Sequence, residues 1–172
     1  RKESSAASDV YKRQQRNALI EKLARELGAF CKDTYLALDP DLQKEFSQAM
    51  GVRALKNIML SMMARQGDES AFELAYQQYE ATGNMSERLG ALRVLVWNDA
   101  PQAEAALRDF YLRFKDEALS LDQWFTLQAA HPCATTETIQ YLTSHADYDL
   151  GVPNRIRSVS GGLNANLSLI HI

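Results

Sequence analysis

The residues best suited to bind a ligand lie in the segment GVPNRIR, residues 151–157. Pro153 is expected to begin a helix there, which places Asn154, Arg155 and Arg157 in or near its first turn. Positive charge in a first turn opposes the helix dipole unless an anion lies nearby. A guanidinium offers a planar pair of donors that fits a carboxylate. We therefore treat Asn154, Arg155 and Arg157 as candidate substrate-binding residues for a peptide terminus or an acidic partner residue.

The two arginines of this segment are not expected to share one ligand. Residues two apart on a helix point about 200° away from each other, so one arginine is expected to face inward and the other outward. The alternative to ligand binding is an ion pair within the chain, with Asp147 or Asp149 as the acid. The sequence leaves both interpretations open.

The rest of the sequence contains no motif typical of catalysis. It has no His-Glu-x-x-His zinc motif, no Gly-rich phosphate loop, no Gly-x-Ser-x-Gly elbow and no Cys/His cluster. Its three histidines are His131, His145 and His171, and its two cysteines, Cys31 and Cys133, match no metal spacing. The sequence therefore predicts no catalytic residue and no metal ligand in this chain. The cysteines are expected to be reduced, as in a cytoplasmic compartment.

The elements that must position these residues are predicted to be helices. Apolar residues recur at helical spacing, with almost no period-two alternation, and Gly, Pro, Asn and Asp separate the segments. The expected helices lie within residues 19–28, 39–50, 52–67, 68–83, 84–99, 101–117, 122–131, 135–142 and 153–159. In the last of these helices, Ile156 and Val159 are expected on the inner side. Candidate N-caps are Asp39, Asp68, Asn84 or Ser86, and Thr135 or Thr136.

This pattern predicts an all-α fold. Short polar turns make consecutive helices antiparallel neighbours, and two helices form a unit of roughly 33 residues, the size of helical-hairpin repeats. The units are not similar to one another in sequence. We therefore expect an irregular α-solenoid of antiparallel helix pairs, like HEAT or armadillo repeats.

Composition limits the classes of partner. The chain has 172 residues, of which 46% are hydrophobic and 24% charged, which is typical of a soluble globular domain. Its 19 Lys and Arg against 22 Asp and Glu give a net charge of −3, and the basic residues do not cluster. Neither nucleic acid nor an anionic membrane surface is therefore an expected partner. No window of about 18 uncharged apolar residues exists, so no membrane-spanning helix is expected.

The two ends of the chain differ from the rest. Residues 1–14 (RKESSAASDVYKRQ) lack apolar periodicity, and residues 164–172 follow a Gly/Asn-rich stretch without completing an element. Both segments are expected to be translated linker sequence that is foreign to the protein. The solenoid domain is therefore assigned to residues 15–163, and the native start and stop are expected to be missing.

Four stretches carry a resemblance to a known family. They are RALKNIML at residues 53–60, GNMSERLGAL at 83–92, LDQWFTLQA at 121–129 and PNRIRS at 153–158. The C-terminal helical domain of the bacterial aminopeptidase N family has similar landmarks, in the same order and at similar separations. The chain resembles that domain from about residue 18 to residue 162.

The resemblance implies an α-solenoid that caps a thermolysin-like catalytic domain and encloses its active site. In that family, the zinc-binding His-Glu-x-x-His motif and the Gly-Ala-Met-Glu-Asn substrate motif belong to upstream domains, and neither occurs here. The resemblance thus implies a fragment of a zinc aminopeptidase, with no cofactor in this chain. Its implied partners are the upstream catalytic domain and short peptides.

The resemblance also implies a role for Arg157. This residue matches the second arginine of the family's Asn-Pro-Asn-Arg-x-Arg segment, whose side chain looks into the cavity near the C-terminal part of the substrate. Val152 replaces the first Asn of that pattern. The turn before Pro153 is therefore expected to differ from the family's turn.

One functional hypothesis and one alternative follow. In the first, the chain is a cap domain, inactive by itself, of a cytoplasmic enzyme that removes N-terminal residues from peptides with a zinc-activated water. In the alternative, it is a free-standing helical-repeat scaffold that binds a protein along its concave face. Upstream sequence that carries the zinc motif would distinguish them.

Overall fold

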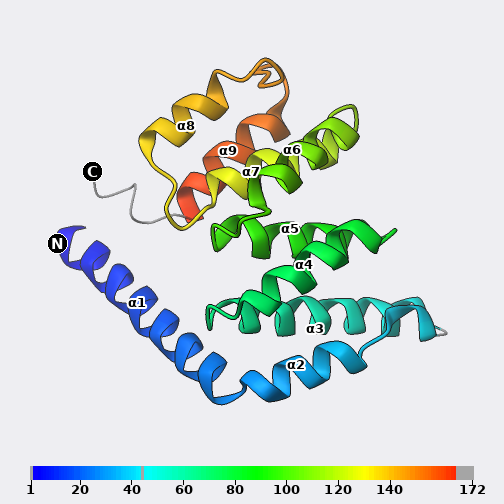
Figure 1. Ribbon diagram of the computed structural model, residues 1–172. Helices are drawn as coiled ribbons and strands as arrows, with labels where there is room; N and C mark the ends of the chain where they lie inside the picture. The colour runs from blue at the N-terminus through cyan, green and yellow to red at the C-terminus, as the bar shows by residue number, and fades with distance from the viewer. Residues whose placement is uncertain (1, 44, 166–172) are drawn as a thin grey trace. The chain divides into compact units, whose positions relative to one another are not determined.

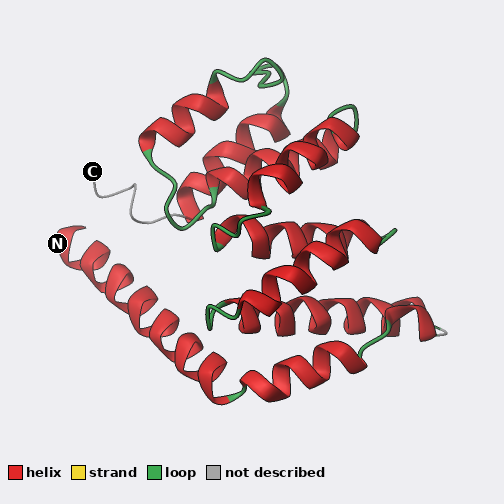
Figure 2. Ribbon diagram, viewed as in Figure 1, coloured by secondary structure: helices red, strands yellow, loops and turns green. Residues whose placement is uncertain are grey.

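The computed structural model describes residues 2–43 and 45–165, and in these residues it contains helices and turns but no strand (Figures 1 and 2). This confirms the all-α prediction. The chain divides into two compact units, Arg1–Gln102 and Ala103–Ile172. Unit 1 holds α1 (Lys2–Glu26), α2 (Gly28–Ala37), the 3-10 helix η1 (Pro40–Leu42), α3 (Phe46–Ala64), α4 (Glu69–Ala81) and α5 (Met85–Trp97). Unit 2 holds α6 (Ala103–Phe114), α7 (Ala118–Ala129), α8 (Thr136–Thr143) and α9 (Pro153–Ala165).

The predicted helix starts are confirmed where a side chain caps the first turn. The Asp68 carboxylate accepts a hydrogen bond from the Ser70 backbone N–H at 2.9 Å, and the Asn84 side chain does the same at the start of α5. Thr135 and Thr138 form a reciprocal capping box before α8. Asp39 also caps as expected, but the element that it begins is η1.

Three predicted boundaries are wrong. Residues 40–50 do not form a single helix, because the η1 turn closes with the Gln43 N–H on the Pro40 carbonyl. Helix α3 then begins at Phe46 and runs without a break through Gly51, whose added Cβ would meet nothing within 4 Å. Helix α7 begins at Ala118, four residues before the predicted start.

Helix α1 passes through residues 2–14, where no element was expected. No Gly or Pro interrupts the segment Lys2–Glu26, so nothing in its backbone opposes a helix. The foreign origin of residues 1–14 stays a prediction. At the other end α9 reaches Ala165, and residues 166–172 lie outside the described residues.

In unit 1, helix α3 lies at the centre and packs against α1, α2, η1, α4 and α5. Its inner side chains Leu60 and Met63 are fully buried, as is Tyr79 of α4. The most extensive packing in the unit is between α4 and α5, followed by that between α2 and α3. The unit is thus a set of paired helices around α3.

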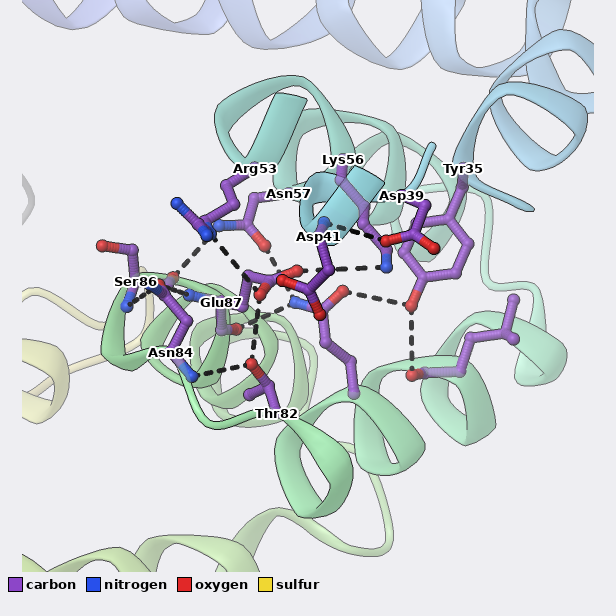
Figure 3. A network of polar contacts seen from close by, with 12 residues as sticks. Tyr35, Asp39, Asp41, Arg53, Lys56, Asn57, Thr82, Asn84, Ser86 and Glu87 are labelled. Carbon is purple, nitrogen blue, oxygen red and sulfur yellow. Dashed lines mark hydrogen bonds and ion pairs between the residues drawn. The ribbon is translucent and has the colours of Figure 1, made fainter. Parts of the chain in front are cut away.

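A polar network also connects the helices of unit 1 (Figure 3). The Tyr35 hydroxyl of α2 donates to Gln78 Oε1 of α4 at 3.1 Å. The Gln78 amide in turn donates to Asn57 Oδ1 of α3 at 2.9 Å and to the Glu87 carbonyl of α5 at 2.8 Å. Asn57 Nδ2 donates to the Ser86 carbonyl at 3.1 Å. Four helices therefore share one chain of hydrogen bonds, and each buried amide of it is paired.

The buried Glu87 carboxylate stands beside two cations of α3 (Figure 3). Its oxygens lie 3.8 Å from Arg53 Nε and 3.9 Å from Lys56 Nζ, and one of them accepts a hydrogen bond from the Thr82 hydroxyl at 3.1 Å. Burial, and secondarily the negative charge of Glu87, raises the pKa of Tyr35 to about 12. Burial of the Tyr35 hydroxyl near Glu87 therefore favours its protonated form.

In unit 2, helix α7 lies at the centre and packs against α6, α8 and, most extensively, α9. Phe125 and Trp124 supply its buried face, and the Trp124 indole N–H donates to the Leu107 carbonyl of α6 at 3.1 Å. Gly162 of α9 approaches α7 so closely that an added Cβ would lie 2.6 Å from the Ala129 Cβ. The α7–α9 contact is therefore a close approach of two helix backbones that a glycine permits.

Gly162→Ala should destabilise unit 2, because the new methyl group would also meet the Ala129 and Ala130 backbone at 2.9 Å. We expect a loss of about 1–3 kcal/mol in the free energy of unfolding, measured by urea denaturation. Gly161→Ala is the matched control. It lies one residue earlier in the same helix and meets nothing within 4 Å, so it should stabilise by about 0.5–1 kcal/mol. Equal effects of the two changes would contradict the tight crossing.

The stability of the chain should depend on Tyr35 at high pH. A folded-state pKa of about 12 means that the native state binds the tyrosine proton more tightly than the unfolded state. The contribution, about 2 kcal/mol, is complete below about pH 10 and is lost as the pH rises toward about 12. The difference in unfolding free energy between the original chain and Tyr35→Phe should therefore shrink over this range. A difference that stays constant with pH would show that Tyr35 titrates normally.

Candidate functional site

The turn before α9 positions the predicted site residues. The Gly151 N–H donates to Asp149 Oδ1 at 2.7 Å and the Val152 N–H donates to the Asp149 carbonyl at 3.2 Å. The Val152 carbonyl then accepts hydrogen bonds from the N–H groups of Arg155 and Ile156, at 3.0 and 3.2 Å. Helix α9 thus begins at Pro153, as predicted.

Arg155 points into unit 2, where it is only 6% exposed. Its Nε lies 2.6 Å from Asp122 Oδ1 of α7, and its Nη1 donates to the Asp147 carbonyl. The guanidinium also lies over the Phe125 ring, 5.1 Å from the ring centroid. As the sequence analysis required, an anion lies beside the positive charge of Arg155 in the first turn of α9. It is the carboxylate of Asp122, whereas the expected ion-pair partners were the carboxylates of Asp147 and Asp149.

Asn154 and Arg157 point outward and are exposed. Arg157 Nη1 donates to Asn154 Oδ1 at 3.4 Å, so the two side chains lie together on the surface of α9. Within the described part of the chain, no ion pair joins Arg157 to Asp147 or Asp149. The expectation that one arginine faces inward and the other outward is confirmed.

Ile156 was expected on the inner side of α9, but its side chain is 37% exposed. The face toward α7 is taken by Arg155, Ser158, Val159 and Gly162, all of which are buried. These residues recur at a spacing of three or four, and Ile156 lies about 100° from Arg155. The buried arginine therefore sets which side of the helix faces the core.

An aromatic and acidic cluster holds the loop that leads into α9. The Tyr111 hydroxyl donates to Asp147 Oδ2 at 2.5 Å, and this hydrogen bond is the main cause that raises the pKa of Tyr111. The Asp147 N–H donates to His145 Nδ1 at 3.2 Å. The His145 ring lies 5.2–5.6 Å from the ring centroids of Tyr111, Trp124 and Phe125. The Asp147 carbonyl that Arg155 binds therefore lies in a loop that the hydrogen bonds of Asp147 with Tyr111 and His145 hold in place.

Asp122 is the site residue that the sequence analysis missed. It was interpreted as the start of a helix, but it lies inside α7 and is mostly buried. Its partner follows 33 positions later in the sequence, and no local pattern connects the two. The available signal was the position of Asp122 within the apolar run LDQWF.

The described residues contain no group of three His, Cys, Asp or Glu side chains that could hold a metal ion. Within the same residues, no helix is both long and apolar enough to cross a membrane. The candidate site consists of the Arg157 guanidinium and the Asn154 amide on the outer face of α9. The buried ion pair of Arg155 and Asp122 lies on the inner face of the same helix.

Comparison with known proteins places the chain in a family. The family model DUF3458_C, described as a domain of unknown function with ARM repeats, matches residues 6–171. This match confirms the armadillo-like α-solenoid. The solved structure of Legionella pneumophila aminopeptidase A in complex with aspartic acid is similar to the chain with a TM-score of 0.77 and 27% identity. The similarity covers 92% of this chain and 20% of that one.

Curated relatives that match most of this chain are aminopeptidases as well. Aminopeptidase N of Escherichia coli K12 is 32% identical over 151 residues, which are 85% of this chain and 17% of the relative. Aminopeptidase N of Haemophilus influenzae is 31% identical over 126 residues, 72% of this chain and 14% of the relative. The chain therefore spans about a sixth of the length of these enzymes. On these grounds the chain belongs to the ARM-repeat family that forms the C-terminal helical domain of aminopeptidases of the N type.

Proposed function

We propose that this chain is the cap domain of a zinc metalloaminopeptidase that removes N-terminal residues from peptides. In this proposal it encloses the active-site cavity and guides the substrate, and catalysis belongs to another domain. The relatives are aminopeptidases about six times as long as the matched segment, which supports a domain of a larger catalytic chain. The described residues do not form a metal site. In this proposal, the chain supplies no step at the zinc.

The observation that carries the substrate role is the outward placement of Arg157 beside Asn154. A guanidinium binds a carboxylate with two parallel N–H donors. The adjacent amide of Asn154 offers a further donor to a peptide. Short peptides with a free C-terminal carboxylate are therefore the ligands that this pair fits best.

The upstream catalytic domain of the same parent chain is the proposed partner. Unit 1 exposes large apolar side chains on α1, on α2 and at the residue between them, namely Leu19, Leu23, Leu27 and Phe30. Exposed apolar patches mark interfaces, and repeat domains bury such faces against neighbouring segments. We place the parent enzyme in the cytoplasm, in line with the two unpaired cysteines.

The purified chain should be inactive on its own. Because its described residues form no metal site, it should release no amino acid from aminoacyl-amide reporters, with or without added zinc. Amino acid release is measured by fluorescence, with a complete aminopeptidase as the positive control. Zinc-dependent turnover by the purified chain would overturn the assignment of the active site to another domain.

In the complete enzyme, Arg157→Ala should raise KM for peptides that carry a free carboxylate and leave aminoacyl reporters without one unchanged. A charge-assisted hydrogen bond contributes about 1.5–3 kcal/mol, so the rise should be on the order of tenfold to a hundredfold. Steady-state kinetics with matched peptide and reporter substrates measures it.

Two further variants sharpen this experiment. Arg157→Lys should recover part of the affinity, because it keeps the charge and loses the planar fork. Arg108→Ala removes another exposed arginine of unit 2 and should leave KM for both kinds of substrate unchanged. If Arg157→Ala lowers thermal stability but does not change the ratio of peptide to reporter KM, the substrate role is wrong.

A further inference from the structure

We infer that Asp122 is a positioning residue for the substrate site: its ion pair with Arg155 fixes the rotation of α9 about its own axis and so directs Arg157 outward. This inference rests on the proposed function of Arg157. The two partners are closely paired, with Arg155 Nε 2.6 Å from Asp122 Oδ1. Both side chains are largely buried, at 7% and 13% exposure.

Helix α9 is held to α7 at two points on one face. Arg155 meets Asp122 near the N-terminal end, and Gly162 meets Ala129 further along. Seven residues separate Arg155 from Gly162, which is about two turns and brings both to the same side of the helix, about 10 Å apart. Two such contacts fix both the rotation and the tilt of α9 against α7.

The direction of Arg157 follows from this rotation. Because Arg157 lies about 200° around the helix from Arg155, burial of Arg155 turns Arg157 away from the core. A side-chain tip lies about 5–6 Å from the helix axis, so a rotation of about 20° would move the guanidinium by about 2 Å. A misplacement of about 1 Å can reduce a rate on the order of a hundredfold. The rotation of α9 therefore controls how well the site fits a carboxylate.

Asp122 is the only carboxylate that the structure pairs with Arg155 within the described residues. The second polar partner of this guanidinium is the backbone carbonyl of Asp147, which carries no net charge. Without Asp122, a buried cation would lack its counter-charge, and such a group moves toward water. We expect α9 to rotate as this guanidinium moves outward, which would carry Arg157 with it.

The test compares Asp122→Ala, Asp122→Asn, Arg157→Ala and the double variant Asp122→Ala/Arg157→Ala in the complete enzyme. Asp122→Ala should raise KM for free-carboxylate peptides on the order of tenfold and spare aminoacyl reporters. Asp122→Asn keeps an oxygen acceptor for Arg155 and should raise KM less. In the Arg157→Ala background, the Asp122→Ala change should have no further effect on the peptide KM, because Asp122 acts through Arg157.

Asp109→Ala is the matched control, since it removes the carboxylate of an exposed ion pair on α6. It should leave both KM values unchanged. A second readout does not depend on substrate. Labelling with phenylglyoxal, followed by mass spectrometry of the folded enzyme, should modify Arg157 and spare Arg155 in the original protein. In the Asp122→Asn variant, Arg155 should become modified at least severalfold faster, which keeps the inference testable if Asp122→Ala does not fold.

The outcomes separate this inference from the proposed function. If Arg157→Ala leaves the peptide KM unchanged, the proposed substrate role fails, and the positioning role fails with it. If Arg157→Ala raises the peptide KM but the Asp122 variants do not, only the positioning role is wrong. A loss in Asp122→Ala that is equal for peptide and reporter, or that persists in the Arg157→Ala background, would also overturn it.

Discussion

The burial of one guanidinium determines the geometry of unit 2. Arg155 places a full positive charge inside the helical core, and this charge is tolerated only because Asp122 and the Asp147 carbonyl receive its donors. The same pairing requires a fixed loop before α9, which the hydrogen bond from Tyr111 to Asp147 supplies. The outward direction of Arg157 is a consequence of where Arg155 must lie.

Unit 1 also pairs a buried charge on one helix with opposite charges on another, but there the buried group is an acid. One buried charge there is the carboxylate of Glu87 on α5, and its compensating cations, Arg53 and Lys56, come from α3. The amides of Gln78 and Asn57 extend the network to the neighbouring helices. In helical repeats whose apolar faces are similar to one another, such polar contacts specify which pairs of helices meet and at what rotation.

Local sequence signals predicted the helices and several of their ends. Asp68, Asn84 and Thr135 are short polar residues directly before apolar periodicity, and each caps a helix. Signals of this kind did not predict every helical segment. The residues on either side of Gly51 were predicted to belong to two separate helices, but Gly51 lies within α3. Residues 2–14 were predicted to form no element, but they are part of α1.

Part of the candidate site could also be predicted from local sequence signals. Helical geometry alone showed that Arg155 and Arg157 must point in opposite directions. It did not show which one is buried, because that choice depends on Asp122, a residue on another helix. The sequence analysis also placed Ile156 on the inner side of the helix, since hydrophobicity favours an isoleucine over an arginine in a core. The ion pair overrides that preference.

The most direct test of this account is a crystal structure of the complete aminopeptidase with a bound short peptide that carries a free carboxylate. The account predicts that the peptide carboxylate lies within hydrogen-bond distance of the Arg157 guanidinium, with the Arg155 side chain still paired to Asp122. A peptide carboxylate bound to Arg155, or a peptide that makes no contact with α9, would contradict it.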